Sequence, residues 1–248
     1  MSFSHVLITR PQADADRLAG LLASIGIDSI VQPAQEFKPR TLAASETHEL
    51  GRLGQPQLVI FTSPRAVEFG LPQLPASLVG TARFAAIGPA TARAIMAAGR
   101  KVDIAPAQGY TSESLLEVLA GQPGVGGGTA LVLCAPGGRE LLVRSLEDLG
   151  WIVRALWVYE RSAAEIQPRS LEAISEAQGL LTVFTSAQAM ESLSQRLPPA
   201  AWYTICKGDW LVISERLRRL ARAFGPHQIH LAGGPQNADL ANAIRSLT

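Results

Sequence analysis

The chain has few of the residues that build disulfide frameworks, metal sites or base-stacking surfaces. Its 248 residues include only two cysteines and four histidines, and aromatic residues make up 6%. Cys134 and Cys206 do not make a disulfide framework, which indicates a reducing compartment such as the cytoplasm. Cysteine, histidine and acidic residues never cluster at the spacing of metal ligands, so the sequence predicts no metal site.

Net charge and hydrophobic runs argue against two further classes of partner. The formal charge is +1, from 22 basic and 21 acidic residues, which leaves no overall field to hold nucleic acid. No apolar run approaches the roughly 18 to 20 residues that span a bilayer. The N-terminus lacks a basic flank followed by a long apolar region, so we expect no secretory signal. We therefore predict a cytoplasmic protein that binds neither nucleic acid nor membrane.

Short apolar runs alternate with Ala- and Leu-rich helical runs along the whole chain. Continuous apolar strands that alternate with helices are typical of parallel sheets covered on both faces, so we predict an α/β fold. Several helical runs end on glycine, among them Gly26 and Gly150, where a left-handed residue commonly ends a helix. The expected strands lie at residues 5–9, 28–33, 57–61, 83–87, 101–105, 129–133, 151–159, 180–184, 209–213 and 227–232.

The two halves of the sequence resemble each other. The strand that ends in Phe61-Thr62-Ser63 has a counterpart that ends in Phe184-Thr185-Ser186, 123 residues later (184 − 61). Ile87 and Ile213, which end two further strands, are 126 residues apart (213 − 87). A period this long is not that of a solenoid and indicates an α/β unit of about half the chain that occurs twice. The glycine-rich stretch at 120–129 is the candidate boundary between the copies.

Small and polar residues follow most of the predicted strands. In open parallel sheets, ligands bind outside the carboxyl ends of the strands, where helix N-termini present unpaired N–H groups that suit anions. Such residues are also ordinary helix caps, and for any single turn the cap is the simpler interpretation. Six turns together favour a cleft lined by N–H donors that would hold a flexible polycarboxylate. They are Thr9-Arg10-Pro11, Thr62-Ser63-Pro64, Gly88-Pro89-Ala90-Thr91, Ala135-Pro136-Gly137-Gly138, Thr185-Ser186 and Ser214-Glu215-Arg216.

Residues for nucleophilic catalysis do not form a recognisable constellation. His5, His48, His227 and His230 are scattered, and no serine lies in a nucleophile elbow. The basic run at 214–225 places Arg residues between Leu and Ala at helical spacing, which favours a solvated helix face over a nucleic-acid surface.

Taken in order along the chain, several segments resemble the uroporphyrinogen-III synthase family. They cover nearly the whole length, and their order carries the resemblance. The segments are VLITRP (6–11), FTSPRAVEFG (61–70), AAIGPATARAIMAAG (85–99), YTSESLLEVLA (110–120), VYER (158–161), VFTSAQAMESL (183–193) and VISERLRRLA (212–221). The resemblance implies a cofactor-free lyase that cyclises hydroxymethylbilane to uroporphyrinogen III, with loss of water and inversion of ring D, in haem, sirohaem or cobalamin biosynthesis.

The implied reaction is compatible with a chain that has no His or Cys constellation. Hydroxymethylbilane carries acetate and propionate arms, which many N–H donors suit better than one ion pair. Its hydroxyl leaves with modest acid help to give an electrophilic azafulvene, and a spirocyclic intermediate would follow. Steering the ring closure is then a matter of shape and positioning.

The resemblance also implies an arrangement of two similar lobes in which the first βαβ segment packs with the back of the second half, and vice versa. Lobe 1 would combine residues 1–36 and 163–248, and lobe 2 would contain 37–162. Two crossing strands, in linkers near 33–39 and 157–164, would join the two parallel-sheet lobes around a cleft. The sequence alone leaves this exchange and two tandem domains as alternatives.

Carried over to this chain, the family pattern predicts which residues contact substrate. Ser63 and Ser186 would act chiefly through their backbone N–H groups, and Tyr159 in VYER is the candidate general acid. Where some relatives have Gly-Pro-Thr-Thr, this chain has Ser214 to Leu217, and Ser214 and Arg216 would have to substitute. The full candidate substrate-binding set is Arg10, Thr62, Ser63, Gly88, Pro89, Thr91, Gly137, Thr185, Ser186, Ser214 and Arg216.

Partners follow from the same resemblance. We expect a monomer that takes the small molecule hydroxymethylbilane, handed over by the preceding enzyme of the pathway, and needs neither metal nor cofactor. Two other classes stay open: a non-enzymatic two-lobed module that binds tetrapyrroles or other polyanions, and a regulatory domain that uses this fold. A regulatory domain of this kind is typical of chains fused to a DNA-binding segment. Nothing in this sequence favours a fused helix-turn-helix, because the two copies account for its 248 residues.

Overall fold

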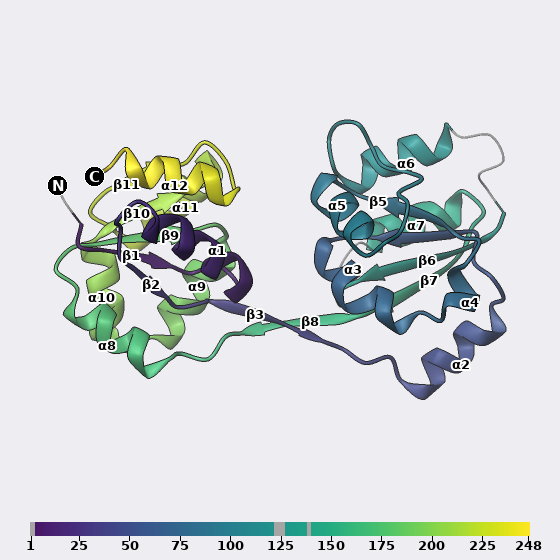
Figure 1. Ribbon diagram of the computed structural model, residues 1–248, viewed down its shortest axis with the longest axis horizontal. Coiled ribbons are helices and arrows are strands. Elements are labelled where there is room, and N and C mark those ends of the chain that lie inside the picture. The colour runs from purple at the N-terminus through teal and green to yellow at the C-terminus, as the bar shows by residue number, and fades with distance from the viewer. Residues whose placement is uncertain (1–2, 122–126, 138–139) are drawn as a thin grey trace. The chain divides into compact units, whose positions relative to one another are not determined.

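The chain forms two compact units in the computed structural model, which describes residues 3–121, 127–137 and 140–248 (Figure 1). Unit 1 comprises Met1–Glu36 and Ser162–Thr248, and unit 2 comprises Phe37–Arg161. The sequence division ended the second lobe one residue later, at 162. The candidate boundary between the copies, at 120–129, lies inside unit 2, so the two sequence copies are not the two compact units. Its residues 122–126, like Gly138 of one predicted turn, lie outside the described residues.

The chain passes between the units twice, within strands β3 (Gln35–Pro39) and β8 (Tyr159–Ala163). These two strands form a two-stranded sheet of their own. The backbone N–H of Arg40 continues the association by donating to the Val158 carbonyl over 3.0 Å. The crossings therefore lie in regular secondary structure.

Unit 1 contains one five-stranded sheet and the helices around it. All its neighbouring strands pair in parallel, in the order β11-β10-β9-β1-β2. Its elements are β1 (His5–Ile8), α1 (Gln12–Ala23), β2 (Ser29–Val31), α8 (Pro168–Glu176), β9 (Leu180–Phe184), α9 (Ala187–Arg196), α10 (Pro199–Lys207), β10 (Asp209–Val212), α11 (Glu215–Ala221), η2 (Arg222–Phe224), β11 (Ile229–Leu231) and α12 (Asn237–Arg245).

Unit 2 contains a four-stranded parallel sheet in the order β5-β4-β6-β7. An isolated parallel bridge between Ala85 and Ile104 adds one residue beyond β5. Its elements are α2 (Ala44–Arg52), β4 (Leu58–Phe61), α3 (Pro64–Gly70), η1 (Leu71–Gln73), α4 (Ala76–Val79), β5 (Arg83–Ala86), α5 (Pro89–Ala97), α6 (Ser112–Ala120), β6 (Thr129–Cys134), α7 (Glu140–Asp148) and β7 (Ile152–Trp157).

The two sheets share one strand order, which explains the internal repeat. Read from the far edge, β11-β10-β9-β1-β2 corresponds to Ile104-β5-β4-β6-β7. In unit 1, β1 from the first half of the sequence pairs with β9 from the second half, and in unit 2 β4 pairs with β6. Each sheet therefore combines strands from both halves of the sequence. The predicted fold class, two parallel-sheet α/β lobes, is confirmed.

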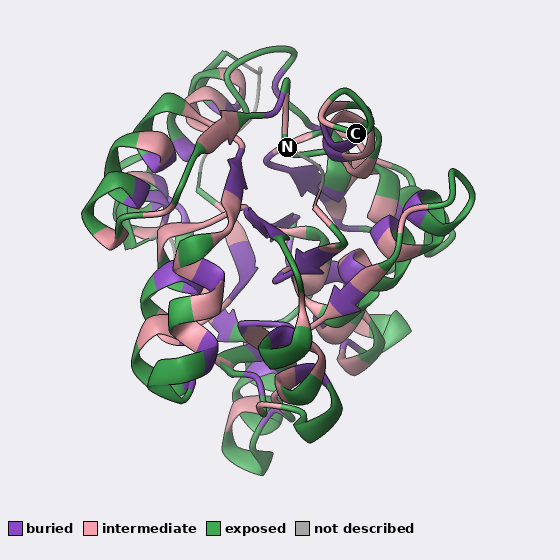
Figure 2. Cartoon of the chain, turned by 90° about the vertical axis from the view of Figure 1, so that its left-hand side faces the viewer, coloured by how far each residue is buried: buried purple, intermediate pink, exposed green. Residues whose placement is uncertain are grey.

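Alternate strand residues supply two hydrophobic layers in each unit, one on either face of the sheet. In unit 1, Leu7 packs towards α8–α11, and its neighbours Val6 and Ile8 pack towards α1 and α12. In unit 2, Phe61 joins the layer under α3 and α5, and Ile60 joins the layer under α6 and α7. Figure 2 shows the result, with buried strands inside and helices whose outer surfaces are exposed.

The predicted strand at 101–105 is wrong apart from the bridge at Ile104. The Asp103 carboxylate explains this, because it accepts the backbone N–H of Phe84 over 3.0 Å, a donor that a partner strand would use. Asp103 also pairs with Lys101 over 2.9 Å. A charged side chain thus takes the place of a strand ladder at this edge.

One carboxylate links the last two strands of the unit 1 sheet. Asp209 lies on β10. Its Oδ1 is 2.8 Å from His227 Nδ1, and its Oδ2 is 3.1 Å from His230 Nε2. Burial on its own raises the pKa of Asp209, but the hydrogen bonds from the two imidazoles outweigh burial and lower it. The ionised carboxylate is therefore favoured in the folded protein.

We expect this cluster to make unit 1 sensitive to acid. A carboxyl whose pKa is lower in the folded than in the unfolded state stabilises the fold above its unfolded pKa, and that contribution is lost as pH falls through the folded value. Asp209→Asn should therefore lose less stability than the wild type when urea unfolding is compared at pH 7 and about pH 3. Equal losses in the two proteins would contradict this role.

Candidate functional site

Three turns of unit 2 lie side by side at the carboxyl edge of its sheet. The Thr62-Ser63 turn follows β4, the Gly88 turn follows β5, and the turn that contains Gly137 follows β6. Since these strands are neighbours in the order β5-β4-β6, their turns are adjacent. This is the edge at which open parallel sheets bind ligands, next to the point where the strand order reverses.

Ser63 caps helix α3 and keeps its own backbone N–H free. Its hydroxyl oxygen accepts the N–H of Ala66 over 3.1 Å. The hydroxyl and the N–H of Thr62 both donate to the carbonyl of Leu133 on β6, over 3.0 and 3.2 Å, which fixes the turn to the neighbouring strand. Among the described residues, the Ser63 N–H has no acceptor.

The Gly88 turn starts helix α5. Gly88 is the N-cap, Pro89 occupies the first turn, and Thr91 is 4% exposed, so little of its side chain can reach a ligand. Tyr110 packs over this turn: a Cβ added at Gly88 would lie only 3.4 Å from the Tyr110 Cβ. Tyr110 is held at a φ of 49°, in the left-handed region that large residues seldom adopt.

The turn after β6 offers backbone in place of reactive side chains. Gly137 is exposed and has a φ of 66°, which favours glycine. Cys134, the last residue of β6, is buried, and burial raises the pKa of its thiol to about 11. Since the thiolate is the nucleophilic form, Cys134 does not serve as a nucleophile.

Tyr159 lies at the start of β8 with its hydroxyl on the Ser63 turn. Its oxygen is 3.1 Å from Ser63 Oγ, and the residue is 5% exposed. The ring meets Phe37 edge-on, with centroids 5.8 Å apart, and is tilted against Phe69 at 6.2 Å. The ring is therefore part of the hydrophobic core of unit 2, and its hydroxyl is paired with a side chain.

Two cations flank the aromatic ring that holds Tyr159. The guanidinium carbons of Arg65 and Arg161 lie 5.5 and 5.4 Å from the centroid of Phe37, a distance typical of cation–π contacts. Arg65 also pairs with Glu68 over 2.5 Å. Two guanidinium groups thus lie beside the Phe37 ring, which itself contacts the Tyr159 ring. The sequence prediction missed Phe37, Arg65 and Arg161. The Arg of FTSPRAVEFG, next but one to Ser63, was the available signal for Arg65.

Unit 1 repeats the Thr-Ser turn with a different partner. Ser186 caps α9 and accepts the N–H of Ala189 over 3.2 Å. Within the described part of the chain, its own N–H donates to no acceptor. Here Thr9, after β1, reaches the carbonyl of Val183 over 2.7 Å, so the neighbouring strands are again tied together by a threonine. Thr185, the counterpart of Thr62, is half-buried, and this contact is made by Thr9 in its place.

Arg10 lies beside the start of α12 in unit 1. Its Nη1 donates to the carbonyl of Pro235 over 2.8 Å and to Asn237 Oδ1 over 2.7 Å. Its Nε is buried without a partner among the described residues. Burial, the largest cause, lowers the pKa of Arg10, and the charge of Asp14 opposes this. A half-buried cation held by neutral acceptors retains capacity for an anion.

The Ser214 turn follows β10, next to the Ser186 turn. The Ser214 hydroxyl accepts the N–H of Leu217 over 3.3 Å, as an ordinary cap of α11. Arg216 is exposed. Unit 1 therefore brings Arg10, Thr185-Ser186 and Ser214 to one edge, as unit 2 does with Ser63, Gly88 and Gly137.

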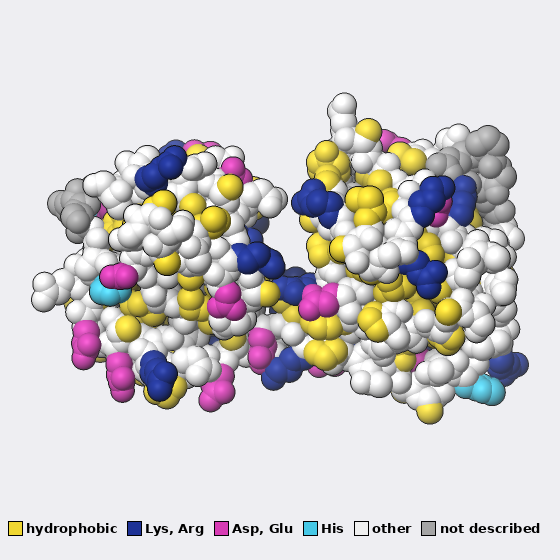
Figure 3. All heavy atoms as spheres, viewed as in Figure 1, with side chains coloured by type: hydrophobic (Ala, Val, Ile, Leu, Met, Phe, Trp, Pro, Cys, Tyr) yellow, Lys and Arg dark blue, Asp and Glu magenta, His cyan; other side chains and the backbone are white. Residues whose placement is uncertain are grey.

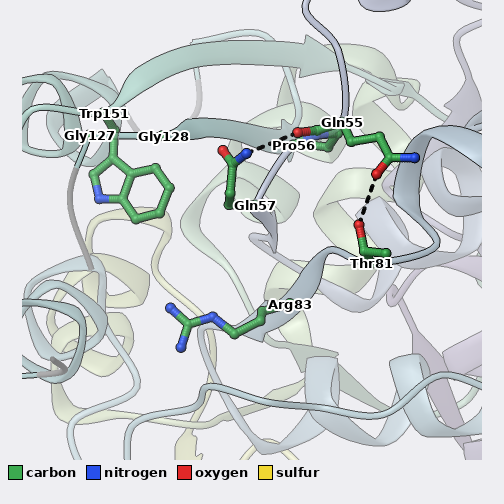
Figure 4. A pocket seen from close by; sticks show the side chains of 8 residues that line it. All are labelled: Gln55, Pro56, Gln57, Thr81, Arg83, Gly127, Gly128 and Trp151. Carbon is green, nitrogen blue, oxygen red and sulfur yellow. Dashed lines mark hydrogen bonds between the residues drawn. The ribbon is translucent and has the colours of Figure 1, made fainter. Parts of the chain in front are cut away.

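The most voluminous of the described pockets lies at the opposite edge of the unit 2 sheet. It encloses about 600 Å³ near the amino ends of β4 to β7. Figure 4 shows two hydrogen bonds within its lining: the Thr81 hydroxyl donates to Gln55 Oε1, and Gln57 Nε2 donates to the Gln55 backbone carbonyl. None of the predicted site residues lines it. Its lining is Gln55, Pro56, Gln57, Thr81, Arg83, Gly127, Gly128 and Trp151.

Charged side chains of both signs are interspersed on the face shown in Figure 3. The helices that the structure describes include none that is long and apolar enough to cross a membrane. In the same residues, no three His, Cys, Asp or Glu side chains gather into a group that could hold a metal ion.

We expect Ser186 to act through its backbone. Ser186→Ala should retain most activity, and an ester in place of the amide before residue 186, which removes only the N–H, should raise KM. Proline is a poor probe, because Ser186 has a φ of −151° and proline requires about −65°. Ester and Ala variants with the same KM would contradict a backbone anion site.

Comparisons with a family model, with known sequences and with solved structures give the same result over nearly the whole chain. The family model described as "Uroporphyrinogen-III synthase HemD" matches residues 16–242. Uroporphyrinogen-III synthase of Escherichia coli (strain K12) is 29% identical, and that of Salmonella typhimurium is 30% identical; each match covers 97% of this chain and 99% of the relative. The crystal structure of the Helicobacter pylori uroporphyrinogen-III synthetase aligns with a TM-score of 0.63 at 15% identity, over 98% of this chain and 99% of that one.

Proposed function

The chain belongs to the uroporphyrinogen-III synthase family, and from this premise we propose that it is a lyase that cyclises hydroxymethylbilane to uroporphyrinogen III. The reaction removes water and inverts ring D. The observation that carries the proposal is a family match over residues 16–242, which include every turn of both sheet edges except that of Arg10.

We assign the acid role to Tyr159. Its phenol has an O–H to donate, and it is held at the carboxyl edge of the unit 2 sheet by Phe37 and Phe69. It would donate that proton to the departing hydroxyl of the substrate, which leaves as water. The phenolate would recover a proton when the pyrrole that has been attacked becomes aromatic again.

The turns would hold the acetate and propionate arms. The N–H groups of Ser63 and Ser186, which donate to no acceptor in the described part of the chain, support this assignment, as does the half-buried guanidinium of Arg10. Arg65 and Arg161, absent from the sequence prediction, add guanidinium groups beside Phe37, the ring that contacts Tyr159. Positioning by such fixed donors can supply much of the rate enhancement when the leaving group departs readily.

Several finer expectations stay with this proposal. The substrate would be handed over by the enzyme that makes it, and the protein would act as a cytoplasmic monomer without a cofactor. Two cysteines with raised thiol pKa values, Cys134 and Cys206, are compatible with a reducing compartment.

An isomer-resolved assay tests the function. The purified protein is given hydroxymethylbilane, the product is oxidised to the porphyrin, and the type III and type I isomers are separated. We expect the type III isomer to dominate when the protein is present. Without the protein, the type I isomer should dominate. Tight binding of the substrate with no type III product would instead identify a tetrapyrrole-binding module.

A further inference from the structure

We propose that the Ser63 hydroxyl is a positioning group for Tyr159: it donates its hydrogen to the phenol oxygen, so that the phenol proton is left free for the substrate. This inference rests on the proposed function, because it concerns the acid of that reaction. It gives Ser63 a second role besides its backbone N–H.

The contact joins two segments that are far apart in the sequence. Ser63 Oγ and the Tyr159 hydroxyl oxygen are 3.1 Å apart, although the residues are separated by 96 positions. The intervening packing is tight: a Cβ added at Gly70, at the end of α3, would lie 2.4 Å from Leu133 and 3.0 Å from Val158. Glycine at position 70 therefore lets the C-terminal end of α3 pack closely against Val158, the residue before Tyr159.

The bonding capacity of the serine favours donation to the phenol. Ser63 Oγ already accepts the Ala66 N–H over 3.1 Å. A hydroxyl has one hydrogen to donate and two lone pairs, and accepting one hydrogen bond polarises it as a donor for the next. Tyr159 is the one described residue near enough to receive that hydrogen.

The phenol ring has little freedom to choose another partner. Phe37 and Phe69 contact it from two directions, and the residue is 5% exposed. The guanidinium groups of Arg65 and Arg161 in turn lie 5.5 and 5.4 Å from the centroid of Phe37. The oxygen is thus held in one place, and a donor at 3.1 Å can determine the direction of its O–H.

The proton balance is simple. The phenol O–H bond breaks and a new O–H bond forms on the substrate hydroxyl, whose C–O bond then breaks to release water. The negative charge left on the phenolate oxygen is stabilised by the Ser63 O–H, which keeps its own hydrogen. When the substrate loses a proton at the end of the reaction, that proton returns to the phenolate.

The first arm of the test is the single substitution. Ser63→Ala should lower kcat about three- to tenfold, the usual effect of one hydrogen bond, with KM changed less than twofold. Ser63→Thr, which keeps a hydroxyl, should restore most of the loss. Thr111→Ala is the control for the loss of a helix cap alone, because Thr111 caps α6 in the same unit. A kcat for Ser63→Ala equal to that of Thr111→Ala would overturn the proposal.

The second arm is a double-mutant cycle with Tyr159→Phe. If Ser63 acts through the phenol, Ser63→Ala has no further effect on kcat once the phenol hydroxyl is gone. Multiplicative effects of the two changes would overturn the proposal. Its failure is distinguishable from failure of the proposed function, because the latter appears as absence of type III product in the wild type.

Discussion

Tyr159→Phe is expected to lower kcat by about tenfold to a hundredfold, with the type III isomer still the product. General-acid help is typically worth 10² to 10⁴ in rate, and the hydroxyl of this substrate leaves fairly readily unaided, so we place the effect at or below the lower end. The substitution removes one oxygen and keeps the ring that contacts Phe37 and Phe69. Steady-state kinetics with isomer analysis measure both quantities.

A matched control distinguishes the specific effect of the Tyr159 hydroxyl from the general effect of removing a tyrosine hydroxyl. Tyr203 on α10 is 60% exposed, and Lys207 lies 4.7 Å from its ring centroid. Tyr203→Phe makes the same chemical change at a surface and should leave kcat unaltered. Wild-type kinetics in Tyr159→Phe would reduce Tyr159 to a packing residue of the unit 2 core.

Trp210→Ala should destabilise unit 1 by about 3 to 5 kcal/mol, the range for truncating a buried aromatic side chain. Trp210, on β10, is fully buried. Its ring lies 4.5 Å from that of Phe184 and 5.7 Å from those of Trp202 and Phe224, and its Nε1 donates to the Ile205 carbonyl over 2.9 Å. Denaturant unfolding monitored by circular dichroism measures the loss.

The internal repeat supplies the control for this substitution. Phe84, 126 positions earlier (210 − 84), stacks on Phe61 with centroids 6.0 Å apart. Phe84→Ala removes the equivalent ring from unit 2, and Trp210→Phe keeps an aromatic ring in unit 1 and should cost less than Trp210→Ala. A loss below about 1 kcal/mol in Trp210→Ala would show that the cluster repacks without cost.

Local sequence features predicted much of the fold. Phe61-Thr62-Ser63 and Phe184-Thr185-Ser186 end buried strands and begin helices, as their apolar runs and capping residues indicated. The strand at 101–105 failed because its pattern is set by a tertiary contact: the Asp103 carboxylate takes the Phe84 N–H. Hydrophobic periodicity does not register such side-chain competition for a backbone donor.

The placement of the candidate site residues was predicted in part, for a related reason. Residues at strand ends were identified because parallel sheets place them at one edge. The remaining contacts join segments that are far apart in the sequence and whose spacing follows no regular pattern. They are the contact of Ser63 with Tyr159 and those of Phe37 with Arg65 and Arg161. Nothing in a local window distinguishes these residues from ordinary surface arginines and core aromatics.

The exchange of strands between the two halves has a consequence for synthesis on the ribosome. Strand β1 ends at Ile8, but the central strand it needs, β9, begins at Leu180. At about 5 to 20 residues per second, the buried side chains of β1 wait on the order of 10 to 30 seconds for their partner. Unit 2 is continuous from Phe37 to Arg161 and can complete its sheet within that interval. We therefore expect the N-terminal strand to be the segment of the nascent chain that most needs a chaperone.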